Sequence, residues 1–141
     1  MLSTISKFQK NNYKKILVIP MFPQYSTTTT RSIARELANI QKINAYKHME
    51  ILFIKDFHDN SLYVKACAKK INDYQKIKGK PDKLLFSFHG IPQSYICDDE
   101  PYQTQCLKTA DLIAEELNIS KSDYEVAFQS RFGKAEWIKP Y

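Results

Sequence analysis

The chain has 141 residues, 43% of them hydrophobic and 13% aromatic, which is enough to form an ordinary domain with an apolar core. Its formal net charge is +6, but the lysines are spread along the chain and form no compact stripe interleaved with aromatic residues. This distribution argues against nucleic-acid binding.

The first half of the chain is predicted to form two strands and two helices. Lys15–Pro20 (KILVIP) is a short β-branched run that indicates a buried strand ended by proline, and Glu50–Ile54 (EILFI) is the second strand. The segment between them, Arg31–Gln41, is predicted to be an amphipathic helix. Its apolar positions are Ile33, Leu37 and Ile40. Leu62–Ile77 is the second predicted helix, and the face we expect it to bury carries Leu62, Ala66, Cys67, Ile71 and Tyr74.

The second half repeats this alternation. Lys83–Phe88 (KLLFSF) is the clearest strand, and its unbroken apolar character predicts a strand covered on both faces. A helix is expected from Pro101 onward, because acidic residues at 98–100 and a proline at the first position are typical of a helix N-terminus. Its expected core face carries Leu107, Ala110, Ile113, Ala114 and Leu117. Tyr124–Phe128 (YEVAF) is the fourth strand.

Strands that alternate with helices predict an α/β fold with parallel pairing and right-handed crossovers. Ligands of such folds bind beyond the carboxyl ends of the strands. Three loops directly follow predicted strands, namely Met21–Ser26, His89–Tyr95 and Gln129–Trp137. We expect these loops to lie at one end of the sheet and to hold the functional site.

His89 is the leading candidate in these loops. It follows a strand, Gly90 lets the backbone turn or a ligand approach, and Pro92 limits the freedom of the exit. A neutral imidazole held in this way can accept a proton or bind a divalent metal. From spacing alone, a histidine that only caps the sheet through hydrogen bonds is an equally good reading.

The remaining polar and aromatic candidates are weaker. Tyr25 and Ser26 could offer hydroxyls to an anionic ligand near a helix N-terminus, although Ser26 could equally cap the helix. The cluster at 98–100 could bind a metal, but helix capping is the preferred interpretation. Trp137, the single tryptophan, could pack in a core or stack on a flat ligand. His48 and His58 have no ligand partners at metal spacing, so we expect them to be structural or surface residues.

Three stretches together resemble the ferrochelatase family, which inserts ferrous iron into porphyrins. They are Pro20–Thr29 (PMFPQYSTTT), Ser87–Pro92 with Pro101–Thr109 (SFHGIP and PYQTQCLKT), and Phe128–Tyr141 (FQSRFGKAEWIKPY). The resemblance implies two Rossmann-like lobes with a cleft between them. It implies that His89 is the active-site histidine that binds iron and removes pyrrole N–H protons. It also implies that Tyr25, Ser26 and Trp137 line the porphyrin pocket.

Members of that family are longer, and on this resemblance residues 1–80 are the second half of the N-terminal lobe and 81–141 the first part of the C-terminal lobe. The glutamate that partners His89 in iron binding is then expected to be missing from this chain. Half-lobes leave sheet edges unpaired. We therefore expect a chain that alone is marginally folded or associates with itself or a complementary fragment. Because the partner glutamate and half of the porphyrin cleft are absent on this resemblance, we also expect the chain alone to be inactive.

The function expected from the resemblance is the insertion of ferrous iron into protoporphyrin IX to form protohaem, with no cofactor beyond the iron substrate and no sign of an iron–sulfur cluster. The alternative is a non-catalytic remnant that only binds porphyrin or pairs with another subunit. Three widely spaced cysteines, Cys67, Cys97 and Cys106, and the lack of a signal peptide predict free thiols in a cytoplasmic protein. Peripheral contact with a membrane is neither indicated nor excluded.

Overall fold

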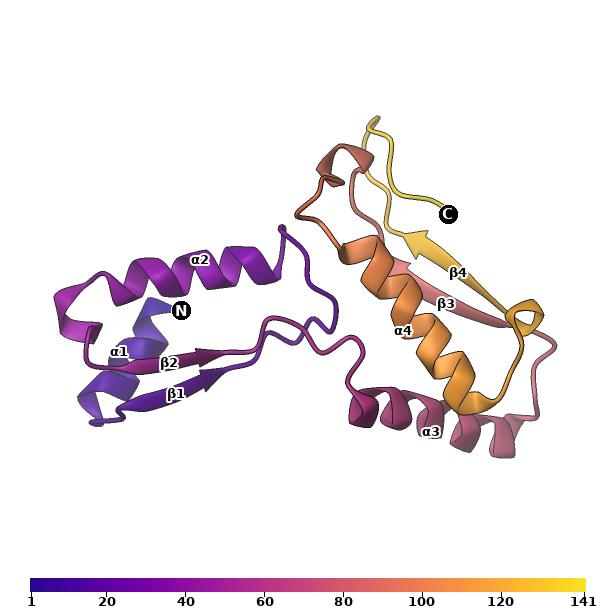
Figure 1. The fold of residues 1–141 in the computed structure, drawn as a ribbon, viewed down its shortest axis with the longest axis horizontal. Coiled ribbons are helices and arrows are strands. Elements are labelled where there is room, and N and C mark those ends of the chain that lie inside the picture. The colour runs from indigo at the N-terminus through magenta and orange to yellow at the C-terminus, as the bar shows by residue number, and fades with distance from the viewer. The chain divides into compact units, whose positions relative to one another are not determined.

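The computed structural model describes all residues 1–141 and shows two compact units, Met1–Phe57 and His58–Tyr141. Their helices and strands are labelled in Figure 1. We call them unit 1 and unit 2. Each unit has its own apolar core and its own pair of parallel strands, so the expected α/β class with parallel sheets flanked by helices is confirmed.

Unit 1 is built around strands β1 (Lys15–Val18) and β2 (Glu50–Phe53). They pair in parallel, with Lys15 opposite Glu50 and Val18 opposite Phe53. The crossover between them contains helix α2 (Thr30–Gln41) and the short 3₁₀ turn η1 (Asn44–Tyr46). Helix α1 (Leu2–Lys10) precedes β1 and was not predicted.

Side chains along β1 and β2 point alternately to the two faces of the unit 1 sheet, and the helices cover one of these faces. Ile16, Val18, Ile51 and Phe53 pack against the buried residues of the helices, which are Ile5, Leu37 and Ile40, together with Tyr46 and Met49. The intervening residues point to the opposite face. Leu17 and Leu52 lie opposite each other there, and they are 54% and 40% exposed.

Unit 2 begins with helix α3 (Ser61–Lys78), followed by β3 (Leu84–His89), helix α4 (Tyr102–Leu117) and β4 (Tyr124–Gln129). The 3₁₀ turns η2 (Gln93–Tyr95) and η3 (Lys121–Asp123) lie in the connections. Strands β3 and β4 pair in parallel from Leu84 opposite Tyr124 to His89 opposite Gln129. Figure 1 shows helices α3 and α4 together on one side of this sheet.

Small residues let helix α4 lie close to the unit 2 sheet. Ala110 and Ala114 are buried against Tyr124 and the strand residues Phe86, Phe88 and Val126. Helix α3 packs through Val64 and Ala68 against Ile113 of α4. The side chain of Asn60 accepts hydrogen bonds from the backbone N–H groups of Leu62 and Tyr63, which fixes the start of α3.

The structure corrects the sequence predictions for β3, α3 and α4. Strand β3 is covered on one face only, because Leu85 on its other face is 66% exposed. Helix α3 buries Val64 and Ala68 rather than the predicted face, since Leu62 and Tyr74 are 76% and 63% exposed. Of the other residues predicted to be buried on α3, Cys67 and Ile71 are partly buried against the core between α3 and α4, whereas Ala66 is exposed.

In helix α4, Leu107 is 39% exposed, whereas Cys106 and Thr109 are buried. Pro101 is the residue before the helix rather than its first position.

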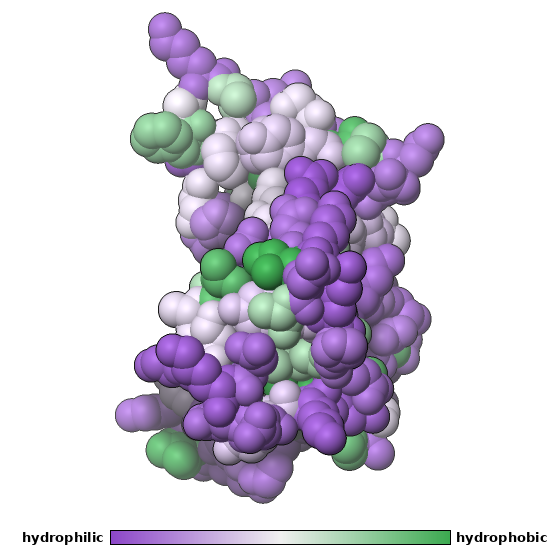
Figure 2. Space-filling view, turned by 90° about the vertical axis from the view of Figure 1, so that its left-hand side faces the viewer, coloured by the Kyte–Doolittle hydropathy of each residue, from purple (hydrophilic) through white to green (hydrophobic).

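The compact units divide between Phe57 and His58 because α3 packs on α4. The lobe boundary expected after residue 80 therefore stays a prediction about the family. Many large apolar side chains reach the surface, as the green areas of Figure 2 show. All three cysteines are free, as predicted. None of the helices has the length and apolar character required to cross a lipid bilayer.

Candidate active site

His89 is the last residue of β3, and its side chain is exposed at the carboxyl end of the unit 2 sheet. Its backbone is held from two sides. The Tyr102 hydroxyl of α4 donates a 2.8 Å hydrogen bond to the His89 carbonyl oxygen, and the Gly90 N–H donates a 2.7 Å bond to the Gln129 carbonyl oxygen. The imidazole therefore extends from a fixed piece of backbone and is exposed.

Gly90 lets Trp137 lie against the backbone next to His89. A Cβ atom at residue 90 would lie 3.0 Å from the Gln129 carbonyl oxygen and 3.3 Å from Cε3 of Trp137. Both distances are shorter than ordinary contacts, so only glycine fits here without displacing a neighbour. The half-buried indole thus lies beside Gly90, at the same end of the sheet as His89.

Residues 130–141 return across this end of unit 2 and hold Trp137 in place. Pro92 and Trp137 form an antiparallel bridge, and the Ile138 N–H donates to the Ile91 carbonyl oxygen at 3.0 Å. The indole N–H donates to the Phe132 carbonyl oxygen at 3.1 Å. Because this N–H already has a partner, the flat face of the ring is what Trp137 can offer to a ligand.

Tyr102 and Cys106 lie one turn apart on α4. The Tyr102 hydroxyl, which holds the His89 carbonyl, is also hydrogen-bonded with the Cys106 thiol. Burial raises the pKa of both groups, and in Cys106 it reaches about 12 despite a smaller lowering by the hydrogen bond with Tyr102. Cys106 is fully buried. It therefore stays a protonated thiol near neutral pH and supports Tyr102 rather than acting as a metal ligand.

Of the three acidic residues before α4, Glu100 is the one that contacts the helix. Its side chain is 5% exposed, and its Oε1 accepts a 3.3 Å hydrogen bond from the Tyr102 N–H. This is a helix-capping contact, in agreement with the preferred interpretation. Asp98 and Asp99 are exposed.

Tyr25 and Ser26 lie in unit 1, in the loop between β1 and α2. Lys55 Nζ lies 4.6 Å from the centre of the half-buried Tyr25 ring, a cation–π contact. Ser26 is 1% exposed, and its hydroxyl lies 2.9 Å from the Thr28 hydroxyl and accepts a hydrogen bond from the Thr28 N–H. Ser26 thus shapes the loop from within, while Tyr25 keeps a partly open ring.

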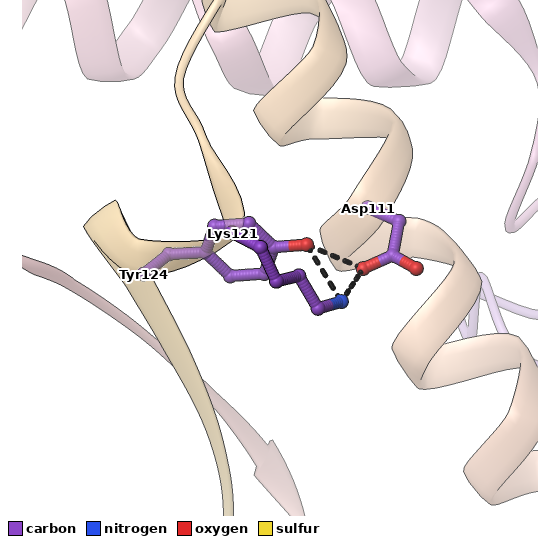
Figure 3. A network of polar contacts seen from close by, with 3 residues as sticks. All are labelled: Asp111, Lys121 and Tyr124. Atoms are coloured by element: carbon purple, nitrogen blue, oxygen red, sulfur yellow. Dashed lines mark hydrogen bonds and ion pairs between the residues drawn. The ribbon is translucent and has the colours of Figure 1, made fainter.

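The opposite end of the unit 2 sheet carries a polar network that ties β4 to α4 (Figure 3). Lys121 Nζ donates to Asp111 Oδ1 at 2.6 Å and to the Tyr124 hydroxyl at 2.9 Å, and that hydroxyl donates to Asp111 Oδ1 at 2.5 Å. Burial opposes ionisation of Asp111, but the hydrogen bonds from Lys121 and Tyr124 outweigh it and lower its pKa. Every member has a partner within the trio, so we read the network as structural.

Two functional features were missed from the sequence. One is Tyr102, whose hydroxyl fixes the His89 carbonyl, and the other is the Gln129 carbonyl, which accepts the Gly90 N–H. The signal was present for Tyr102, because an aromatic hydroxyl in the first turn of a helix can reach the strand end before it. The Gln129 contact is made by backbone atoms, so its side chain gives no signal.

Comparison with known proteins places this geometry in a family. The family model named ferrochelatase matches residues 1–141, the whole chain. The ferrochelatase of Hydrogenovibrio crunogenus is 40% identical over 143 residues, covering 99% of this chain and 36% of the relative. That of Idiomarina loihiensis is 41% identical, covering 97% and 37%, and that of Acinetobacter baumannii is 39% identical, covering 99% and 41%. The chain thus spans well under half the length of these relatives, and it belongs to the ferrochelatase family.

Proposed function

We propose that residues 1–141 supply the imidazole and one aromatic wall of a ferrochelatase that inserts ferrous iron into protoporphyrin IX to form protohaem. The observation that carries the proposal is the exposed His89 side chain at the end of β3, with Trp137 against the adjoining Gly90. Family membership supports the class of reaction. The activity is proposed for a polypeptide of the relatives' length that contains these residues, because the chain matches 36% to 41% of them.

The reaction requires two pyrrole N–H protons to leave as the iron enters the macrocycle. A neutral imidazole can accept such a proton, and an imidazole nitrogen is also an acceptable ligand for ferrous iron. His89 can perform either step because its ring is exposed while its backbone is fixed. The iron is a substrate in this proposal, and no further cofactor is required.

The aromatic side chains provide the surface for the porphyrin. Trp137 offers its ring face, since its N–H is bound to Phe132. Tyr25 is the better contact candidate of the unit 1 pair, because Ser26 is buried and bound within its own loop. The carboxylate that completes the iron site, a glutamate in the resemblance, is proposed to come from the part of the relatives that these residues do not match.

A chimeric enzyme tests the role of His89. Residues 1–141 replace the matching stretch of the Hydrogenovibrio crunogenus relative, and the rate of iron insertion into protoporphyrin IX is measured. We expect His89→Ala to lower kcat/KM by at least about 100-fold, as for loss of a proton-transfer group. His48→Ala, which removes another exposed histidine, is the matched control and should leave the rate unchanged. A chimera that keeps its rate after His89→Ala would overturn the assignment.

The second candidate is a protein that binds porphyrin or pairs with a subunit without catalysis. A chimera that quenches porphyrin fluorescence yet inserts no iron would support this candidate over the enzyme.

A further inference from the structure

The segment of residues 130–141, which returns across the strand ends of unit 2, carries an arginine that has no ion pair. Arg131 is exposed, and its guanidinium carbon lies 3.9 Å from the centre of the Tyr141 ring, a cation–π contact. Glu136 is the one acidic residue of this segment, and it pairs with Lys139 at 3.0 Å. The positive charge of Arg131 is therefore left for an anion from outside the chain.

Two hydrogen bonds connect the surroundings of Arg131 to Trp137. The Tyr141 hydroxyl donates to the Trp137 carbonyl oxygen at 3.2 Å, and the indole N–H donates to the carbonyl oxygen of Phe132, the residue after Arg131, at 3.1 Å. Ser130 before it has φ +72°, a left-handed conformation that a serine keeps only where surrounding contacts fix it. The arginine and the indole thus belong to one braced segment.

Stacking on Tyr141 prepares the guanidinium group for a ligand of defined geometry. A guanidinium is planar and has five N–H donors around its edge, so a ring against one face leaves the edge free. Two parallel N–H donors match the two oxygens of a carboxylate. Lys134 is a second exposed cation in the same segment, but it has no comparable ring contact and no fork of donors. Arg131 is therefore the better carboxylate site of the two.

The aromatic residues next to Arg131 indicate what kind of molecule carries the carboxylate. Phe132 is 84% exposed, and Trp137 offers the flat face of its ring because its N–H is already bound. Aromatic surface beside an unpaired cation suits a flat apolar ligand that has an acidic group at its edge. Protoporphyrin IX combines these features, since its macrocycle carries two propionate side chains on one edge.

We propose that Arg131 binds a propionate of the porphyrin while Trp137 contacts the macrocycle. Arg131 then determines which edge of the macrocycle faces residues 130–141, and it favours porphyrins that carry a carboxylate there. This inference rests on the proposed function, because it requires the porphyrin to lie at Trp137. A carboxylate of a protein side chain has the same chemistry as a propionate, so the test varies the porphyrin as well as the protein.

The test is a titration of the 141-residue chain with protoporphyrin IX and with its dimethyl ester, both in the same non-ionic detergent. The ester keeps the macrocycle and loses both carboxylate charges. Binding is followed by the fluorescence of Trp137, the single tryptophan. We expect the acid to bind about tenfold more tightly than the ester, as for one charge-assisted contact at an exposed site. Arg131→Ala should remove this difference by weakening binding of the acid alone.

Four further variants separate the fork of donors and its ring from charge in general. Lys134→Ala removes the same charge from the same segment and should keep the tenfold difference. Arg131→Lys keeps the charge without the fork and should restore only part of it. Tyr141→Leu removes the ring beneath the guanidinium and should narrow the difference, whereas Tyr141→Phe keeps the ring and should preserve it.

Three results would overturn the inference. The first is equal affinity of the acid and the ester for the unchanged chain, which would leave the proposed function intact as long as both quench Trp137. The second is a difference that survives Arg131→Ala in a variant that is folded by circular dichroism. The third is an Arg131→Ala variant that binds both porphyrins more weakly to the same degree, as expected if the arginine only supports the segment. If neither porphyrin quenches Trp137, the proposed porphyrin surface is contradicted together with the role of Arg131.

Discussion

Units 1 and 2 share a parallel strand–helix–strand connection but differ on the sheet face that no helix covers. In unit 1 that face pairs Leu17 with Leu52. In unit 2 it pairs Leu85 with Glu125, Ser87 with Ala127, and then His89 with Gln129. The covered faces are apolar in both units and specify the fold. The uncovered faces distinguish them, because the leucine pair of unit 1 gives only apolar surface, whereas the face of unit 2 continues past Leu85 and two short side chains to an imidazole.

The strand ends differ in the same way. Beyond β1 the chain turns through Pro20 into a loop that buries Ser26 and leads to Thr30, the buried first residue of α2. Beyond β3 the chain leaves His89 exposed and lets Trp137 lie against Gly90. Similar topology therefore produces a closed loop in one unit and an open site in the other.

Large-to-small substitutions in the two apolar cores should give the largest loss of stability, and they test whether each unit is stabilised by its own core. Phe128 is 1% exposed in unit 2, and Phe128→Ala should cost roughly 3–5 kcal/mol. Leu37 is 4% exposed in unit 1, and Leu37→Ala should cost roughly 2–5 kcal/mol. Amide hydrogen exchange, read residue by residue, should show lost protection in the mutated unit only. Equal loss in both units would contradict the division.

Gly90→Ala should disturb the open site of unit 2 and leave unit 1 intact. The new methyl group would crowd the Gln129 carbonyl and Trp137, at a cost of roughly 1–3 kcal/mol. The intrinsic fluorescence of the single tryptophan should change with it. Gly133→Ala is the control. Its backbone has φ +70° but nothing lies within 4 Å, so it should cost about 1 kcal/mol with little change at Trp137.

Tyr102→Phe should loosen the backbone of His89 with a smaller loss of stability. It removes the hydrogen bond to the His89 carbonyl and the one with the Cys106 thiol, and a neutral hydrogen bond contributes about 1 kcal/mol net. Faster exchange at the Gly90 amide is the readout. Tyr95→Phe serves for comparison because the Tyr95 ring is 48% exposed and lies on the same loop. Equal exchange rates at the Gly90 amide in the Tyr102→Phe and Tyr95→Phe variants would show that Tyr102 does not position the His89 backbone.

Asp111→Asn should have the smallest effect, and that effect should depend on pH. The pKa of Asp111 lies below its ordinary value of 3.8 in the folded chain. Its carboxylate therefore stabilises unit 2 above that value, and the contribution is lost as the pH falls through the folded-state pKa. Thermal unfolding should show a small deficit at pH 7 that vanishes in acid. A deficit that grows in acid, or one matched by the exposed control Asp82→Asn, would contradict the network in Figure 3.

The strands and the position of His89 could be predicted from the sequence because short apolar runs with proline or glycine behind them are local signals. All four predicted strands lie within a residue or two of those observed. The buried face of α3 could not be predicted in the same way. Leu62 and Tyr74 form one apolar stripe and Val64 and Ala68 another, and only the position of α4 decides between them.

The path of residues 130–141 across the strand ends also could not be predicted from local sequence patterns. Its bonds join backbone atoms of Ile138 to Ile91 and of Phe128 to Pro140, so no side-chain spacing indicates them. Residues 2–10 do carry a local signal for α1, the apolar pair Ile5 and Phe8 at helical spacing.

Titration of the 141-residue chain with protoporphyrin IX tests the central claim most directly, because the single tryptophan and the three histidines can each be followed. We expect quenching of Trp137 fluorescence and a ring-current shift of the His89 imidazole in NMR spectra, both saturating at the same porphyrin concentration, while His48 stays unchanged. If the porphyrin shifts the NMR signals of His48 and changes neither those of His89 nor the fluorescence of Trp137, the account is contradicted.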